Sequence, residues 1–162
     1  MPERQHEDEI RLIEQAQQGD SGAFGELYEF YAPLVFRFLF AHLSERQDAE
    51  DLTEEVFLKV WEALPGFRQR GVPFGGYLFR VARNALYDHF RQARRKRSLH
   101  TPHDQDWLEE THPDPADSLP ARFEQREIHA VLGRLSEDYR MVVSLRFLVG
   151  LSTEETAEAM GR

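Results

Sequence analysis

The sequence contains no cysteine among its 162 residues. This absence excludes disulfide bonds and thiolate metal sites, and it is compatible with the reducing environment of a cytoplasm. Long hydrophobic runs are also missing. The most apolar stretch, Leu34 to Leu43, is interrupted by Arg37 and His42 and is shorter than the roughly 20 residues of a membrane-spanning helix. Because residues 1–10 are acidic and polar, we expect no signal peptide, no membrane insertion and a cytoplasmic location.

Positive charge is scarce overall but is concentrated in one stretch. The net charge of the chain is −9, yet the segment from Arg80 to Arg97 holds seven bases and one acid. This segment therefore carries +6, which leaves −15 on the rest of the chain. Such segregation keeps one strip attractive to phosphate while the remaining surface repels it, so the acidic average is compatible with a nucleic-acid-binding face.

The apolar residues recur with helical spacing, and no run alternates as a strand would. The second predicted helix, with Ser21 as its N-cap and Pro33 as a source of a kink, directs residues such as Phe24, Tyr28 and Phe38 inward. The sequence predicts an all-α fold with helices over Glu7–Gln18, from Ser21 through Leu39, Arg46–Leu64, Tyr77–Arg97, Ala121–Leu135, Glu137–Val149 and Glu154–Met160.

The helical pattern is broken once, after Ser98. The segment from His100 to Pro120 contains four prolines, six acids and no Lys or Arg, which is typical of an extended linker. We therefore expect two small helical domains, residues 7–97 and 121–162, joined by an acidic flexible linker, residues 98–120.

The end of the chain has the pattern of an incomplete helix-turn-helix. Gly150 ends one helix, and Ser152 with Glu155 forms a capping box that begins the next. Two residues after Met160 the sequence stops, before the second helix that would enter the major groove. We expect a C-terminal truncation here, since Ala157 and Met160 would otherwise lack an apolar partner. Val131 is expected to face inward on the helix that opens this domain.

Four segments in the same order resemble the extracytoplasmic-function (group 4) sigma factors of bacterial RNA polymerase. They are LIEQAQQGDSGAFGELYEFYAPLVFRF, DAEDLTEEVFLKVWEALPGFR, FGGYLFRVARNALYDHFRQARR and LSEDYRMVVSLRFLVGLSTEETAEAMG. The resemblance extends from about Leu12 to Gly161, apart from the linker. It implies a region 2 helical bundle that binds core polymerase and melts the −10 element, and a helix-turn-helix region 4 for the −35 element.

The resemblance implies a core-polymerase-binding surface on the helix that begins at Arg46. Its acids would face the β′ clamp, with part of the apolar stripe packing beneath them. A solvated acidic face at the positive helix end is the alternative reading of the same residues. Glu54 stands where the family often has Gln, and we expect this to increase the salt dependence of core binding. The expected contact residues are Asp48, Asp51, Leu52, Glu54 and Glu55.

The DNA-binding residues implied by the resemblance lie in the next loop and helix. Aromatic and amide groups beside a basic strip can stabilise an unstacked base, and arginines can hold phosphates. Tyr77 stands where the family usually has Trp, and its smaller ring can still stack on a base. Phe79 and Phe90 are expected in the core. The expected DNA-contacting residues are Phe67, Arg68, Gln69, Phe74, Tyr77, Arg80, Arg83, Asn84, Arg91, Arg94 and Arg95.

We expect no metal, no cofactor and no enzymatic activity. His100, His103 and His112 lie near acids, but in a proline-rich segment without a helix to fix a metal geometry. No phosphate loop or catalytic constellation is present in the sequence. The partners implied by the family are core RNA polymerase, through the β′ clamp and the β flap, promoter DNA and an anti-sigma factor.

Two other classes of protein fit parts of the sequence. A sigma mimic that sequesters an anti-sigma factor would not need seven bases along one helix. An ordinary helix-turn-helix repressor would have no use for the N-terminal unit and its acidic helix. Both readings therefore explain less of the chain than a sigma factor does.

Overall fold

The computed structural model describes residues 2–68, 73–98 and 119–162, with the side chains of residues 2–4, 98 and 119–124 left out. Every regular element in this part of the chain is helical, which confirms the predicted all-α class. The elements are α1 (Pro2–Gln17), α2 (Ser21–His42), α3 (Arg46–Ala63), the 3-10 turn η1 (Leu64–Gly66), α4 (Phe74–Ser98), α5 (Leu119–Gly133), α6 (Glu137–Val143), the π-helical segment η3 (Ser144–Val149) and α7 (Thr153–Ala159).

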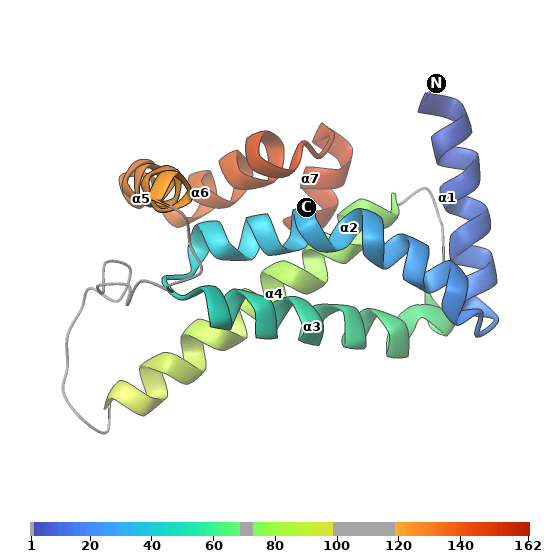
Figure 1. The fold of residues 1–162 in the computed structure, drawn as a ribbon, viewed down its shortest axis with the longest axis horizontal. Coiled ribbons are helices and arrows are strands. Elements are labelled where there is room, and N and C mark those ends of the chain that lie inside the picture. Colours follow the sequence, from blue (N-terminus) through green and yellow to red (C-terminus); the bar gives the residue numbers. More distant parts are fainter. Residues whose placement is uncertain (1, 69–72, 99–118) are drawn as a thin grey trace.

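Helices α2 and α3 run lengthwise beside each other and α4 crosses behind them (Figure 1). The C-terminal helices lie on the other side of α2, where α5 and η3 contact α2 and α7 contacts α4. The inward face at the centre of α2 is fully buried, with Val35, Phe38 and Leu39 at 0% exposure. The Phe38 ring meets the Phe79 ring of α4 edge to face at 5.7 Å. Full burial of such a side chain stabilises the fold by about 1.5–3 kcal/mol, so this contact fixes α4 against α2.

Helix α1 begins at Pro2, five residues before the predicted Glu7, and the N-cap of α2 differs from the prediction by one residue. The N-cap of α2 is Asp20, whose carboxylate accepts hydrogen bonds from the N–H groups of Gly22 and Ala23 at 2.9 and 3.1 Å. Ser21 is the first helical residue instead. Gly19 enters this turn with φ = +93°, a conformation that glycine adopts without strain. The helix continues through Pro33, and the predicted kink there stays a prediction.

Gln17, at the end of α1, holds the chain that leads out of α3. Its side-chain amide donates to the carbonyls of Leu64, at 3.1 Å, and Phe67, at 2.5 Å. One amide NH₂ has two hydrogens, so a single side chain can satisfy both acceptors. The contact fixes η1 and the first residue of the segment that precedes α4.

The C-terminal helices follow the predicted signals with local changes. The capping box of Ser152 and Glu155 is confirmed, and Gly150 ends η3 with φ = +86°. The helix predicted over Glu137–Val149 changes its hydrogen bonding at Ser144, where the π-helical turn begins. Val131 was predicted to face inward but is 59% exposed, and Tyr28 of α2 is 39% exposed.

The C-terminal helices share one hydrophobic core with α1 to α4. Leu145 and Ala159 are 0% exposed and Met160 is 7% exposed, all within the cluster that includes Phe38 and Phe79. The expectation that Met160 would lack an apolar partner was therefore wrong. Helix α7 packs along α4, and η3 packs along α2. The two predicted domains thus form one continuous packed body in the described residues.

Two histidines lie in the seam between α2 and the C-terminal helices. His42 is 2% exposed, and its Nε2 lies 2.8 Å from the Ser144 hydroxyl. Because that hydroxyl donates its one hydrogen to the Met141 carbonyl, His42 Nε2 must be the donor. Burial, with smaller effects of Arg140 and His129, lowers the pKa of His42 to about 3. Burial also lowers the pKa of His129, whose ring donates to the Phe40 carbonyl.

We predict that the fold loses stability as the pH falls below 6.5. The ordinary pKa of histidine is 6.5 and that of folded His42 is about 3, so below pH 6.5 the unfolded chain binds a proton that the folded chain does not. Between pH 7.5 and 5.5, His42 alone should lower the free energy of unfolding by on the order of 1 kcal/mol. Urea unfolding at both pH values measures this difference. It should shrink in His42→Gln, which keeps a donor for Ser144, and persist in His6→Gln, a change at an exposed position of α1.

We also predict that Gln17→Ala destabilises the protein by about 1–3 kcal/mol, because the partly buried Phe67 carbonyl loses its Gln17 donor and the Leu64 carbonyl keeps the Phe67 N–H alone. Urea unfolding gives the change in free energy. Gln15→Ala is the matched control, since Gln15 is exposed on the same helix and its replacement should change stability by less than about 0.5 kcal/mol. Equal effects of the two substitutions would contradict a specific role for Gln17.

Candidate core-binding and nucleic-acid interface

An exposed acidic face runs along α3. Asp51, Glu54 and Glu55 are exposed, whereas Leu52 is 6% exposed and packs in the core beneath them. The helix has no side-chain cap at its N-terminus, so the carboxylates of its first turns also compensate the positive end of the helix dipole. Leu52 therefore supports this face from inside, and its side chain offers little surface to a partner.

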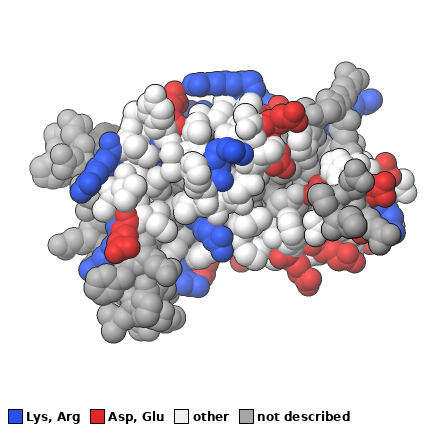
Figure 2. All heavy atoms as spheres, turned by 90° about the horizontal axis from the view of Figure 1, so that it is seen from above, with Lys and Arg blue, Asp and Glu red and all other residues white. Residues whose placement is uncertain are grey.

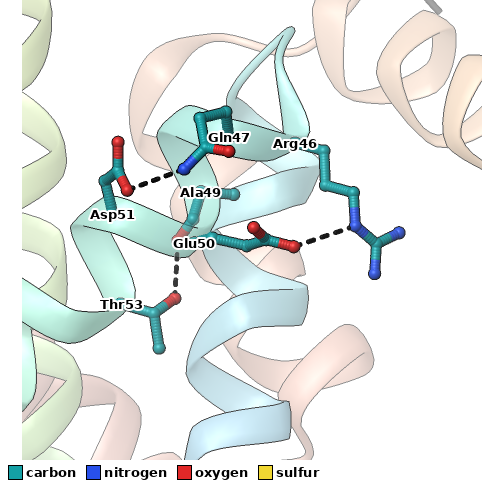
Figure 3. A network of polar contacts seen from close by, with 6 residues as sticks. All are labelled: Arg46, Gln47, Ala49, Glu50, Asp51 and Thr53. Atoms are coloured by element: carbon teal, nitrogen blue, oxygen red, sulfur yellow. Dashed lines mark hydrogen bonds and ion pairs between the residues drawn. The ribbon is translucent and has the colours of Figure 1, made fainter. Parts of the chain in front are cut away.

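Several of these side chains already have neighbours on the same helix. Gln47 donates to Asp51 at 2.8 Å, and Arg46 pairs with Glu50 at 3.1 Å (Figure 3). Lys59 pairs with Glu55 at 2.9 Å. Exposed pairs of this kind contribute about 0.3–0.5 kcal/mol each, so an incoming cation can displace them at little cost. Figure 3 also shows Thr53 turned inward to donate to the Ala49 carbonyl at 2.6 Å.

Two residues modify the predicted surface. Asp48 lies 3.9 Å from His89 of α4, so its carboxylate faces the neighbouring helix as well as solvent. Leu58 is 57% exposed and lies on the Asp51 side of α3, since it follows Asp51 by seven residues and Glu54 by four. Periodicity could have found Leu58, because it falls outside the apolar stripe formed by Leu52, Val56 and Val60.

An aromatic cluster stands where α4 begins. The rings of Phe67 and Tyr77 are stacked with centroids 4.6 Å apart, and Phe74 meets Phe67 edge to face at 5.9 Å. Phe74 is 3% exposed and also contacts the Tyr31 ring at 5.5 Å. Phe74 was expected to contact DNA, but its ring is core and cannot stack on a base in this arrangement. Phe67 and Tyr77 are partly exposed and provide the accessible aromatic surface.

Burial raises the pKa of the Tyr77 phenol, so its hydroxyl keeps its proton and can donate a hydrogen bond. Burial also raises the pKa of Tyr31, with the neighbouring carboxylates Glu9 and Glu155 adding to the effect. Tyr31 donates to the Glu9 carboxylate of α1. Arg68 is exposed next to this cluster, and Gln69, the remaining residue expected in the loop, lies outside the described residues.

The basic strip of α4 is divided between two faces. Tyr77, Asn84 and Arg91 follow one another at seven-residue spacing, and of these Asn84 and Arg91 are exposed. Arg94 and Arg95 extend the exposed surface toward the end of the helix. Arg91 is paired with Asp88 of its own helix at 2.6 Å. This side of α4 is open to solvent, as expected for a DNA-contacting face.

The second face of α4 is turned toward the C-terminal helices. Arg80 pairs with Glu158 of α7 at 3.0 Å. Arg83 lies over the Tyr87 ring at 4.8 Å. Both arginines were expected to hold phosphate, yet in this arrangement α7 and α4 itself supply their neighbours. Periodicity alone could not assign them to a separate face, because the partner helix lies about 80 residues further along the chain.

The described residues contain no group of three or more His, Asp or Glu side chains placed to hold a metal ion. His100, His103 and His112 lie outside these residues. Within the same described part, none of the helices combines the length and apolar character that crossing a membrane requires. Viewed from the side of α5 to α7, much of the surface is uncharged, and the acidic residues gather toward one end (Figure 2).

Comparison with known proteins matches both halves of the chain to one family. The family model Sigma-70 region 2 matches residues 27–96, and Sigma-70, region 4, matches residues 125–162. The chain is 35% identical to the ECF RNA polymerase sigma factor BldN of Streptomyces coelicolor over 94% of its length, and it spans 58% of that protein. It is 34% identical to the ECF RNA polymerase sigma factor SigD of Mycobacterium tuberculosis, covering 93% of this chain and 72% of SigD.

A solved structure agrees with this assignment. The structure of CnrH in complex with the cytosolic domain of CnrY has a TM-score of 0.71 and 26% sequence identity, over 95% of this chain and 82% of that one. CnrH is an RNA polymerase sigma factor of Cupriavidus metallidurans. Helix order, the acidic face of α3, the aromatic and basic surface of α4 and these matches lead to the same conclusion: the chain belongs to the extracytoplasmic-function sigma factors of the sigma-70 family.

Proposed function

We propose that this protein binds core RNA polymerase and directs promoter-specific transcription initiation by recognising and melting the −10 element. The observation that carries the proposal is the adjacency of two unlike surfaces. The acidic face of α3 and the aromatic and basic surface of α4 belong to helices that pack against each other in one bundle. A protein that must place DNA beside a polymerase needs such a pair of faces on one rigid body.

The acidic face would bind the β′ clamp of the polymerase. Asp51, Glu54 and Glu55 present carboxylates to solvent, and Leu58 adds an exposed apolar contact among them. Charges at the rim of an interface speed association, while a central apolar anchor slows dissociation. Leu58 is thus the proposed apolar anchor of this surface, and its acidic residues would speed association with the polymerase. Asp48 lies at the side of the surface, and Leu52 packs beneath it.

The surface at the start of α4 would capture the unstacked strand. A flipped base needs a ring to stack on, and base–aromatic stacking contributes about 1–3 kcal/mol per base. The stacked pair of Phe67 and Tyr77 supplies such rings. The pair is held in place by the ring contact of Phe67 with Phe74 and by the hydrogen bond from Gln17 to the Phe67 carbonyl. Asn84 and Arg91 would follow the strand along the open face of α4, with Arg94 and Arg95 at its end.

The C-terminal helices would serve the −35 element and contact the β flap, as region 4. The acidic linker, of which residues 99–118 lie outside the described residues, would cross the polymerase cleft between the two units. The relative CnrH was solved together with the cytosolic domain of CnrY, which supports an anti-sigma protein as a further partner here. The protein would act in the cytoplasm without catalysing covalent chemistry itself.

Binding to core polymerase followed by run-off transcription tests this function. A library of promoter fragments is transcribed by core polymerase in the presence and in the absence of the protein. The expected result is stable binding to core polymerase and promoter-dependent transcripts that require the protein. If the protein neither binds core polymerase nor supports transcription at any promoter, the proposed function is wrong.

Charge reversal on α3 should weaken core binding. We expect Glu54→Lys to raise the dissociation constant for core polymerase about tenfold and to reduce its dependence on salt, because one attractive charge becomes repulsive. Glu29→Lys is the matched control, as Glu29 is exposed on α2 away from this face. Fluorescence anisotropy at several salt concentrations measures both quantities. A similar loss in the two variants would place the binding surface elsewhere.

Aromatic and basic residues should affect DNA binding differently. With a labelled single-stranded DNA library, Tyr77→Ala should weaken binding about tenfold without changing the salt dependence, since stacking involves no counterion release. Arg91→Ala should lower the slope of log affinity against log salt by about 0.7, the value for one phosphate contact on a single strand. If Tyr77→Ala changed the slope and Arg91→Ala did not, these two roles would be wrongly assigned.

A further inference from the structure

Helix α1 contacts the residues that hold the stacked rings of Phe67 and Tyr77, the ring pair proposed to receive an unstacked base. The helix is itself fixed in the shared core, where Ile13 is 1% and Ala16 is 3% exposed. Its C-terminal end lies beside η1, the turn that leads to Phe67 (Figure 1). Helix α1 is therefore a rigid support whose side chains can fix the ring pair from outside the DNA-binding surface.

The first contact of α1 with this region holds the Phe67 backbone. Phe67 follows η1 with extended backbone, at φ = −70° and ψ = 132°, so its carbonyl has no partner of the kind that a continuing helix would supply. The Gln17 side chain donates to this carbonyl at 2.5 Å, and the Phe67 N–H donates to the Leu64 carbonyl at 3.0 Å. Both backbone polar groups of Phe67 are thus bonded, which leaves the ring only the freedom of its side-chain torsions.

The second contact of α1 acts through two buried rings. Tyr31 is 7% exposed and donates its hydroxyl hydrogen to the Glu9 carboxylate of α1. The Tyr31 ring meets the Phe74 ring at 5.5 Å, and Phe74 meets Phe67 edge to face at 5.9 Å. Because aromatic contacts of this kind have a preferred geometry, a fixed Tyr31 also restricts the orientation of the Phe67 ring.

We propose that α1 is a positioning element for the DNA-binding surface, with Gln17 as the residue that places the Phe67 ring for base stacking. The inference rests on the proposed function of the Phe67 and Tyr77 rings, and Gln17 itself would not touch DNA. A ring pair that is fixed before the base arrives binds without the entropic cost of being ordered. Each side chain that must be ordered on binding lowers the affinity by about twofold to tenfold.

The affinity of the chain bound to core polymerase for a labelled single-stranded DNA library tests the proposal, with core polymerase alone as the background. We expect Gln17→Ala to weaken DNA binding about fivefold, because Phe67 must then be ordered by the base. The slope of log affinity against log salt should stay the same, since no phosphate contact is lost. Gln15→Ala is the matched control, because Gln15 is exposed on the same helix, and it should leave the affinity unchanged.

A double-mutant cycle separates positioning from a general loss of stability. If Gln17 acts by placing the Phe67 ring, Gln17→Ala should change the affinity by less than about twofold in a Phe67→Ala background, where no ring remains to be placed. A role in stability alone would weaken binding by the same factor in both backgrounds, and that result would overturn the proposal. Circular dichroism of all variants checks that the helices persist.

The contact between Tyr31 and Glu9 provides an independent pair of variants, which carries the test if Gln17→Ala does not fold. Tyr31→Phe keeps the ring against Phe74 but loses the hydroxyl that binds Glu9, and it should weaken DNA binding about twofold. Glu9→Gln keeps an oxygen that accepts this hydrogen bond and should bind DNA as the unmodified chain does. Equal affinities of these two variants would contradict a supporting role for α1.

Failure of the positioning role and failure of the proposed function give different results. If Phe67→Ala weakens DNA binding while Gln17→Ala and Tyr31→Phe do not, the ring binds DNA but α1 does not position it. If the unmodified chain adds nothing to the DNA binding of core polymerase alone, the proposed function itself is wrong.

Discussion

The packing of α2 against its neighbours on two sides is the constraint on which the rest of the structure depends. Val35, Phe38 and Leu39 are fully buried, with α3 and α4 on one side and η3 and α5 on the other. Each neighbouring helix packs its apolar face against α2 and leaves its polar face exposed to solvent. The acidic side of α3 and the basic side of α4 are therefore held at a fixed relative position by one shared core. A change at Phe38 would move both functional surfaces together.

The same core explains why the accessible aromatic surface is small. The Phe74 and Phe79 rings are buried where α4 packs against α2. Phe67 and Tyr77 are therefore the rings that lie near solvent. These two rest on each other and on Phe74, and the Phe67 backbone is tied to α1 through Gln17. A pocket for an unstacked base must be rigid before the base arrives, since ordering it on binding would consume the stacking energy. The N-terminal helix thus contributes to DNA binding without touching DNA.

Local signals in the sequence predicted much of this arrangement. Helical periodicity identified the helices, and the capping box of Ser152 and the end at Gly150 follow from side-chain chemistry within a few residues. The exposed acids of α3 follow from the same periodicity. What local signals could not predict were contacts across the chain: the burial of Phe74 by Tyr31, and the pairing of Arg80 with Glu158. The close approach of α7 to Gly76, where an added Cβ would lie 2.9 Å from the Glu158 Cβ, is a third such contact.

The contact between α7 and α4 rests on two kinds of interaction that respond differently to salt. The Arg80 side chain is 48% exposed, so its pair with Glu158 contributes at most about 1 kcal/mol and weakens further as salt rises. The side chains of Leu151 and Met160 are buried in the shared core, and salt does not screen this hydrophobic contribution. Apolar burial, more than the ion pair, therefore holds α7 on α4, and the packing should persist at high ionic strength.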